Sequence, residues 1–262
     1  MKQLKKGLVV LALLSIAFAA FAAEKAMKGE GKYTSKDLAD LPAFHAIDVR
    51  GDAQVSLVQR SEPSVTVSGL ANLVALANVH VKDGVLIVEY KEPIHVKGQY
   101  HLYVSVIAPE IKHITVTDMG DVKVRGMFKG TELHIKAHEK GEVSMDGVQL
   151  EKLNIHADKH ADVEVEDLHA NHVHAAIYDK AELELSGKAT KTRLENHGAG
   201  ELNAEDLHST HVEAVMAGSG KISAYPDKMF HANVIGTGKI SYKGSPAEMK
   251  REGKLKHIQW KD

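Results

Sequence analysis

The chain of 262 residues is predicted to be an all-β protein whose main part is a right-handed parallel β-solenoid, a β-helix-like stack of coils of about 20 residues. Two observations predict this fold. A phrase made of a small residue, a charged residue and then alternating aliphatic and polar residues occurs seven times between Gly120 and Tyr242, at intervals of 18 to 21 residues. Such alternation is typical of strands with one buried face, and no helical periodicity separates the phrases.

The first 22 residues are expected to be a signal peptide, and they are set apart from the fold. Residues 2–6 contain three lysines, residues 8–18 form a short apolar run, and residues 20–22 have the small-residue pattern of a cleavage site. The apolar run is too short to span a bilayer comfortably. We therefore expect an exported protein, in the periplasm, outside the cell or at its surface, with no stable membrane insertion after cleavage.

Charge and cysteine content argue against several classes of function. Removing the three lysines of the expected signal peptide from 33 Lys and Arg leaves 30 against 35 Asp and Glu, a net charge of −5 with neutral histidine. A mildly acidic chain is a poor match for nucleic acid or for anionic lipid. The chain has no cysteine, so it forms no disulfide and offers no thiol for chemistry.

Two segments precede the repeated phrases. Residues 23–40 are polar and are expected to be a flexible lead-in. Residues 41–110 are expected to form a less regular N-terminal β segment, because aliphatic residues alternate with polar ones in several short runs. Within this segment, Asp83-Gly84 is typical of a two-residue hairpin turn. Residues 72–77 are expected to form one helical turn, since two leucines lie three positions apart.

Residues 111–245 are predicted to form the solenoid itself, with two strands in each coil. In a parallel solenoid, the first aliphatic residue of each phrase stacks in one inward column: Val122, Val143, Val163, Leu183, Leu202, Ile222 and Ile240. A meander of antiparallel hairpins is the alternative. Successive strands would then reverse, and the repeated register would be harder to keep. Right-handed winding is the rule for connections between parallel strands.

Both ends of such a stack need protection, because unpaired strand edges promote aggregation. Residues 41–110 are expected to cap one end. At the other end Pro246 stops the repeat, and the basic tail 246–262, which contains Trp260, is expected to cap the last coil. The alternative for both segments is a solvated chain that caps nothing.

Four stretches of the N-terminal segment carry a resemblance to a known family: residues 44–51 (FHAIDVRG), 55–59 (VSLVQ), 65–67 (VTV) and 79–87 (VHVKDGVLI). From residue 41 to about 245 the chain resembles the bacterial GIN domain family, the head domains assigned to auto-transporter adhesins. The resemblance implies an exported protein with a right-handed β-helix-like fold. The shared motifs are strands and glycines and contain no set of reactive groups, so they imply little about activity.

The charged residues of the phrases are expected to face outward and to stack from coil to coil at about 4.8 Å. The densest cluster has four acids on two adjacent coils: Asp162, Glu164, Glu182 and Glu184. Stacked carboxylates repel each other, so either their pKa values rise or cations lie between them. Their oxygen atoms suit Ca²⁺, and we regard them as a candidate ligand or cation face. The alternative is a solvated face, neutralised by Lys159 and Lys180, that keeps neighbouring solenoids apart.

Histidine is the second unusual feature, with 17 in the chain. Two similar corners, 167–172 and 206–211, each contain a pair separated by two residues: His169 with His172, and His208 with His211. Each pair is a candidate for zinc, although the two corners would lie about 10 Å apart, too far to share one ion. The alternative is a set of polar corner residues without a metal. Many imidazoles on one surface would still make its charge depend on pH near about 6.5.

These patterns favour a non-catalytic, adhesin-like binding module that presents flat solenoid faces to a polysaccharide or a protein. No catalytic triad, phosphate-binding glycine loop or helical zinc motif is found, and no cofactor is expected beyond the Ca²⁺ or Zn²⁺ considered above. One alternative is a carbohydrate-active enzyme that uses paired carboxylates of the acidic face, although aromatic residues, which commonly contact sugars, make up only 5% of the chain. The other is an envelope protein that binds Ca²⁺ or Zn²⁺.

The last two phrases differ from the others in the sign of their charge. They carry Lys221 and Lys239 where the earlier phrases carry an acid. The rod is therefore expected to have an acidic flank and a basic end, and the basic end is the first place to look for a partner. Homo-oligomerisation is left open by the sequence.

Overall fold

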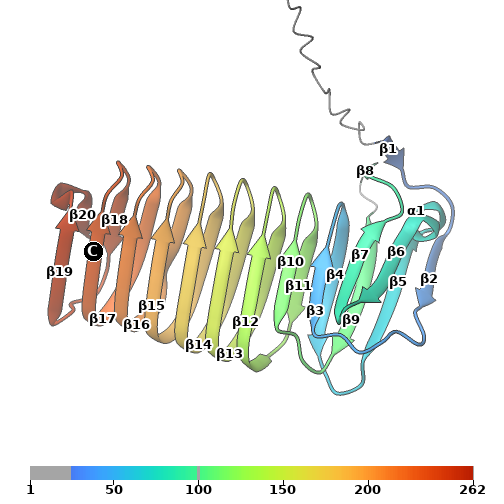
Figure 1. Ribbon diagram of the computed structural model, residues 1–262, viewed down its shortest axis with the longest axis horizontal. Helices are drawn as coiled ribbons and strands as arrows, with labels where there is room; N and C mark the ends of the chain where they lie inside the picture. Colours follow the sequence, from blue (N-terminus) through green and yellow to red (C-terminus); the bar gives the residue numbers. More distant parts are fainter. Residues whose placement is uncertain (1–24, 99–100, 262) are drawn as a thin grey trace, which may run out of the picture.

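Figure 1 shows a computed structural model of the protein, a rod of stacked strands that describes residues 25–98 and 101–261. The expected signal peptide lies outside these residues. The strands are β1 (Lys25–Lys28), β2 (Tyr33–Asp37), β3 (Ala46–Val49), β4 (Ala53–Gln59), β5 (Ser64–Leu70), β6 (Ala77–Lys82), β7 (Val85–Tyr90), β8 (Ile94–Lys97), β9 (Leu102–Ala108), β10 (His113–Val116), β11 (Asp121–Arg125), β12 (Phe128–Ala137), β13 (Glu142–Ala157), β14 (Asp162–Ile177), β15 (Glu182–Asn196), β16 (Glu201–Met216), β17 (Lys221–Val234), β18 (Lys239–Tyr242), β19 (Glu248–Gly253) and β20 (Ile258–Trp260). The helices among the described residues are α1 (Ala71–Leu76) and η1 (Leu255–His257). Neither is long and apolar enough to cross a membrane.

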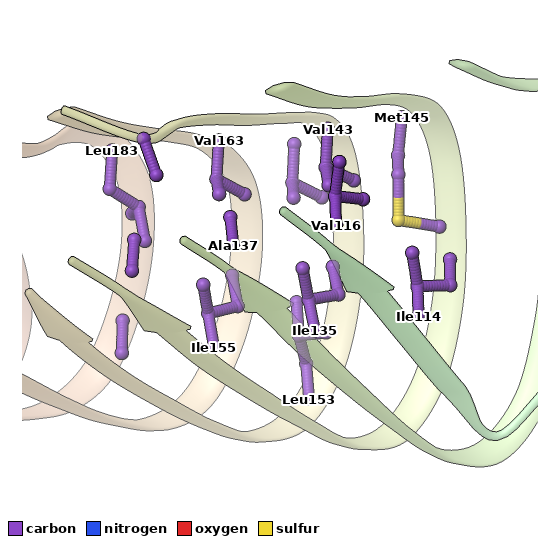
Figure 2. Packing of buried hydrophobic residues seen from close by; sticks show 14 of the residues in the cluster. Ile114, Val116, Ile135, Ala137, Val143, Met145, Leu153, Ile155, Val163 and Leu183 are labelled. Atoms are coloured by element: carbon purple, nitrogen blue, oxygen red, sulfur yellow. The ribbon is translucent and has the colours of Figure 1, made fainter. Parts of the chain in front are cut away.

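The body of the rod is a parallel β-solenoid, as the repeated phrases predict. Each of the strands β13 to β17 follows most of one coil, so its first half lies on one side of the rod and its second half on the other (Figures 1 and 2). Neighbouring coils pair in parallel with like residues in register: Val143 lies beside Val163, and Val163 beside Leu183. This pairing excludes the antiparallel meander.

The inward residues of successive coils form one continuous apolar core. Every member of the predicted column from Val122 to Ile240 is buried. Across the core, Ile114, Ile135 and Ile155 stack from coil to coil (Figure 2). The alternation of buried and exposed residues along each strand therefore decides which side chains reach the solvent and can form a site.

The solenoid begins earlier than residue 111, and its first coils are out of chain order. Strand β3 pairs in parallel with β10 on one side and with β7 on the other, while β4 lies in the same way between β11 and β9. The coil made by β3 and β4 therefore lies between the coil made by β7 and β9 and the coil made by β10 and β11. The solenoid therefore begins before the predicted boundary at residue 111. The sequence does not show this, because the coils formed by β3 with β4 and by β7 with β9 have turns of different lengths and lack the repeated phrase.

Antiparallel strands cover the N-terminal end of the rod. Strand β5 pairs antiparallel with β9, β2 with β5, and β6 with β7. The 23–40 segment therefore contains strands β1 and β2, where the sequence predicted a flexible lead-in. The polar composition of this segment does not reveal the strand, because β2 is an exposed outer strand that is held mainly by backbone hydrogen bonds.

The local predictions for the N-terminal segment are confirmed. The turn at Asp83 and Gly84 joins β6 to β7, and both residues have positive φ, at 52° and 76°. This is the requirement of a tight hairpin turn that an Asp-Gly pair satisfies. The predicted helical turn is present as α1, which buries Leu73.

The C-terminal tail continues the stack, although the sequence predicted that the repeat stops at residue 245. Strand β19 pairs in parallel with β17, and β20 with β18. The Trp260 indole donates a hydrogen bond to the carbonyl oxygen of Gly244 at 3.2 Å. The charged sequence of β19 concealed the strand, and charge of this kind discourages further pairing at an edge.

The corners of the coils change type along the rod. In four successive coils one corner residue has positive φ: Asp118, Glu139, Lys159 and Asp179. In the next three coils the corresponding residue is Gly198, Gly218 or Gly236, and a side chain there would overlap the backbone of the coil before. The change occurs at Asn196, which is fully buried. Its side-chain amide donates to the carbonyl of Gly200 at 2.8 Å, and its Oδ1 accepts from the N–H of Gly198 at 2.9 Å.

We predict that Gly218→Ala destabilises the rod strongly. The added Cβ would overlap the carbonyl oxygen of Gly198, so two coils would have to separate, at a cost of about 2 kcal/mol or more. Gly130→Ala is the matched control, because the nearest atom to its Cβ would be Leu150 Cδ2 at 3.4 Å. Thermal unfolding measures both. An equal fall in the midpoints of the two variants would contradict the close-packing explanation.

Candidate functional site

The two sides of the rod carry different charges. One side, the acidic face, consists of the outward residues of β11 and of the first halves of β13 to β16. Its main column follows the predicted order, in register on neighbouring strands: Asp121, Glu142, Asp162, Glu182 and Glu201. The next outward column contains Glu164 beside Glu184. Lysine partners occur at the two ends, where Lys123 contacts Asp121 at 3.5 Å and Lys221 contacts Glu201 at 2.6 Å.

The predicted four-acid cluster lies in the middle of this face, without a basic partner among residues 25–98 and 101–261. Asp162 lies beside Glu182, and Glu164 beside Glu184, along an open depression of about 370 Å³. Ion pairs in the described part of the chain involve none of the four, and Lys159 and Lys180 do not neutralise them. Partial burial, followed by repulsion from Glu182 and Glu164, raises the pKa of Asp162. Burial and repulsion from Glu164 also raise the pKa of Glu184.

These carboxylates are therefore held close together against their mutual repulsion. Their oxygen atoms are the ligand type that Ca²⁺ prefers. Binding of Ca²⁺ at this cluster stays a prediction.

The opposite side of the rod, the histidine face, consists of the outward residues of β10 and of the second halves of β12 to β17. One column on successive strands contains His113, His134, Asn154, His174, Arg193, Glu213 and His231. The rings of His113 and His134 are stacked, with centroids 4.9 Å apart. The histidine pairs at the two corners are only part of this face. The signal for the whole face is the spacing of His113, His134 and His174, which lie 21 and 40 residues apart, or one coil and two coils.

Zinc binding by His169 with His172, or by His208 with His211, stays a prediction. The two corners lie two coils apart, with one lysine between equivalent histidines. Lys188 lies between His169 and His208, and Lys191, three positions further along the strand, lies between His172 and His211. We call these six residues the basic patch. The sequence concealed this arrangement because the coil that contains the lysines is one residue shorter at the bend, where the pairing shifts in register.

The basic patch borders two open depressions that lie next to each other. One, of about 630 Å³, is lined by Gln149, His169, Asn171, Lys188 and Thr190 among others. The other, of about 600 Å³, is lined by Lys152, His172, Lys191, Arg193 and His211 among others. Together they span several coils, and their lining includes many side chains that can donate hydrogen bonds.

A single carboxylate anchors the middle of the histidine face. Nε2 of His174 and Nε2 of His197 each lie 3.0 Å from an oxygen of Glu195, and the Arg193 guanidinium also contacts it. Burial alone would raise the pKa of Glu195. The hydrogen bonds from Arg193, His197 and His174 outweigh burial and lower the pKa to about 2. This anion therefore holds three cationic or titratable side chains in place.

A further apolar cavity of about 630 Å³ lies at the N-terminal end of the rod. It is lined by Leu38, Leu41, Phe44, Pro63 and Val65 among others. These residues belong to the segment before β3 and to the start of β5, so this cavity lies outside both charged faces.

We predict that Glu184→Gln stabilises the protein at neutral pH. A raised carboxylate pKa means that the charged form is disfavoured in the fold, so the penalty is present above the folded pKa and disappears as pH falls through it. Removing the charge should raise stability by about 0.2–0.5 kcal/mol at pH 7. Glu201→Gln, which removes an acid paired with Lys221, should give no gain. Thermal unfolding at pH 7 and pH 4 measures both, and a gain that persists at pH 4 would contradict repulsion as its cause.

We predict that Glu195→Gln destabilises the protein at neutral pH by about 1–2 kcal/mol. The lowered pKa means that Glu195 contributes stability above its ordinary pKa, near 4.3, and that this contribution is lost as pH falls towards 2. Glu213→Gln is the control, since Glu213 is 43% exposed and contacts only Arg193 among the ion pairs found. Urea unfolding between pH 7 and pH 2 should show the two variants and the parent converging at the acid end.

Comparisons with known proteins agree with this architecture. A family model described as "Putative auto-transporter adhesin, head GIN domain" matches residues 43–166 and 147–246. No curated protein matches the chain.

Similar solved structures include three from two Parabacteroides species. A "putative adhesin" from Parabacteroides distasonis has a TM-score of 0.79 and 24% identity, covering 90% of this chain and 100% of its own. A "Putative lipid binding protein" from the same organism has a TM-score of 0.81 and 21% identity, covering 91% and 100%. A "putative adhesin" from Parabacteroides merdae has a TM-score of 0.76 and 21% identity, with the same coverage. These likenesses establish the shared fold, and because the family model spans most of the chain, this protein belongs to the GIN domain family.

Proposed function

We propose that the protein is an exported, non-catalytic adhesion module that binds an acidic polysaccharide through its basic patch. The observation that carries this proposal is the arrangement of three basic residues in each of two columns three positions apart along the strands, with Lys188 and Lys191 at their centre. Both lysines are exposed, and none of the ion pairs found in the described part of the chain uses them. Their charge is thus available to a ligand.

The geometry of the patch favours a long polymer over a small molecule. Bases on successive coils repeat at about the strand spacing of 4.8 Å, and the two depressions beside them are open. A polymer with regularly placed carboxylates or sulfates can contact several of these bases at once. Asn171, Thr190 and Gln149 line the same surface and can bond to sugar hydroxyls.

The rest of the molecule supports the same direction of binding. The acidic face on the other side would repel a polyanion, so the ligand approaches the histidine face. The acidic cluster lies in an open depression and not in a closed pocket. Burial in a pocket is what usually shifts the pKa of a catalytic carboxylate, so this geometry favours a non-catalytic protein over a glycoside hydrolase that uses the acidic face. Membership of an adhesin family and the expected export support a position at the bacterial surface or in the periplasm.

We predict that polygalacturonate binds the protein and that neutral dextran does not. Replacing both patch lysines, Lys188→Ala with Lys191→Ala, should weaken binding about fivefold to tenfold and reduce its dependence on salt. The matched control replaces Lys221 and Lys239, two lysines of the acidic side, with alanine. Affinity electrophoresis of the full exported chain measures all three proteins.

Several outcomes would overturn the proposal. Equal retention on dextran would exclude charge recognition, and a larger loss in the control variant would place the ligand at the basic end near Lys221. Binding to phospholipid vesicles without binding to either polysaccharide would point to the apolar cavity at the N-terminal end. New reducing ends after incubation with polygalacturonate would show catalysis.

A further inference from the structure

We propose that His138, His156 and Asp158 form a binding site for a divalent transition-metal ion such as Zn²⁺. The three residues lie on two adjacent coils, at the corner where the histidine face ends. They are separate from the basic patch and from the histidine pairs that the sequence singled out. The proposal therefore does not depend on the proposed polysaccharide binding.

The three potential ligand atoms already lie close together. Nδ1 of His138 is 2.8 Å from Oδ2 of Asp158, and Nε2 of His156 is 3.6 Å from the same oxygen. One ligand atom from each residue can be chosen so that all three lie within 4.8 Å of one another. Ligands of a tetrahedral Zn²⁺ at 2.0–2.2 Å from the metal are themselves about 3.3 Å apart. Small side-chain rotations therefore suffice to place an ion between them.

The backbone beneath the site is held by the solenoid ladder. His138 and Asp158 occupy the same corner position in successive coils. The N–H of His138 donates to the carbonyl of Val116 at 2.9 Å, and the N–H of Asp158 donates to that of Ala137 at 3.1 Å. The residues that follow them, Glu139 and Lys159, have almost the same φ, at 60° and 59°. Two of the three ligands are thus pre-positioned by identical corners, which lowers the cost of ordering them around a metal.

The third ligand is oriented by its neighbours. The ring of His156 packs against that of Tyr178 in the next coil, with centroids 4.8 Å apart, and Tyr178 in turn stacks on His197. The residue beside His156 in the next coil is Ala176, whose small side chain leaves the imidazole accessible. The side chains of His138, His156 and Asp158 are 32%, 40% and 23% exposed, so an ion can enter from solvent.

The chemistry of the ligands selects the class of metal. Two imidazole nitrogens and one carboxylate oxygen suit Zn²⁺, Co²⁺, Ni²⁺ or Cu²⁺ better than Ca²⁺, which prefers oxygen ligands alone. Water would complete the coordination, since the corner offers three protein ligands. Imidazole nitrogens bind a metal only when they carry no proton, so binding weakens in acid.

A similar group further along the rod provides the internal control. Glu195 also has two histidines beside it, His174 and His197, but Arg193 contacts the same carboxylate and competes with any ion. These residues do not meet the distance condition that the His138 group meets, within the described residues. Substitution of His174 in this group should therefore leave zinc binding unaffected.

The test uses the full exported chain, prepared without a histidine tag and stripped of metal with a chelator. Calorimetric titration with Zn²⁺ at pH 7.5 should give one saturable site per chain. Asp158→Asn, which keeps a partner for His138 but removes the charge, and His156→Gln should each weaken binding at least about tenfold. His174→Gln, which changes a histidine beside Glu195 and outside the ring stack of His156, should bind as the parent does. Circular dichroism establishes that each variant is folded.

Co²⁺ gives a second readout. Its visible absorption should show four-coordinate bands in the parent and in His174→Gln, and not in Asp158→Asn. NMR of the histidine rings should show shifts at His138 and His156 on addition of Zn²⁺. Absence of saturable binding at 1 mM Zn²⁺, or equal binding by Asp158→Asn, His156→Gln and the parent, would overturn the proposal.

Discussion

The constraint on which the whole structure depends is the parallel, in-register hydrogen-bond ladder between coils. Each residue lies beside the residue one coil later, at about the strand spacing of 4.8 Å. A residue type that recurs once per coil therefore forms a column along the rod. Columns of aliphatic residues form the core, and columns of charged residues form the outer faces. The same rule that stabilises the rod brings the like charges of Glu164 and Glu184 together, a cost that an irregular fold would avoid.

The ladder tolerates variation only at its bends and corners. Coil spacings of 18 to 21 residues are absorbed there, through register shifts and through the change from positive-φ corners to glycine corners at Asn196. Two buried hydroxyl groups at the bend contact each other: Thr192 Oγ1 and Ser209 Oγ lie 2.7 Å apart inside the rod. The functional candidates lie at the same places, since the basic patch lies at the bend and the His138 group at a corner. Side-chain substitutions cost the least stability at positions that do not contribute to the core.

The rod consequently has two chemically distinct sides. The middle of the acidic face consists of carboxylates that have raised pKa values, such as that of Asp162. The histidine face has cationic side chains, imidazoles and the Glu195 carboxylate, whose pKa is strongly lowered. Members of the GIN domain family can change the chemistry of a face by substituting outward residues of the repeat, because these residues take no part in the core. In this chain the exchange of an acid for a lysine at Lys221 closes the acidic column with an ion pair to Glu201.

The sequence by itself determined the parallel solenoid, its inward columns and the cluster of Asp162, Glu164, Glu182 and Glu184. These features follow from a local period, and a regular ladder converts a period directly into neighbours. Tertiary structure alone decided that β7 and β9 stack outside β3 and β4, and that the tail adds β19 and β20. It also decided that Lys188 and Lys191 lie between the histidines of the two corners. Finally, it brought His138 and His156 together beside Asp158 at a corner. Each of these depends on pairing between segments that lack the repeat or on a register shift at a bend. The physical reason is that backbone hydrogen bonds are indifferent to side chains, so which irregular segments pair is settled by turn lengths and burial over the whole chain.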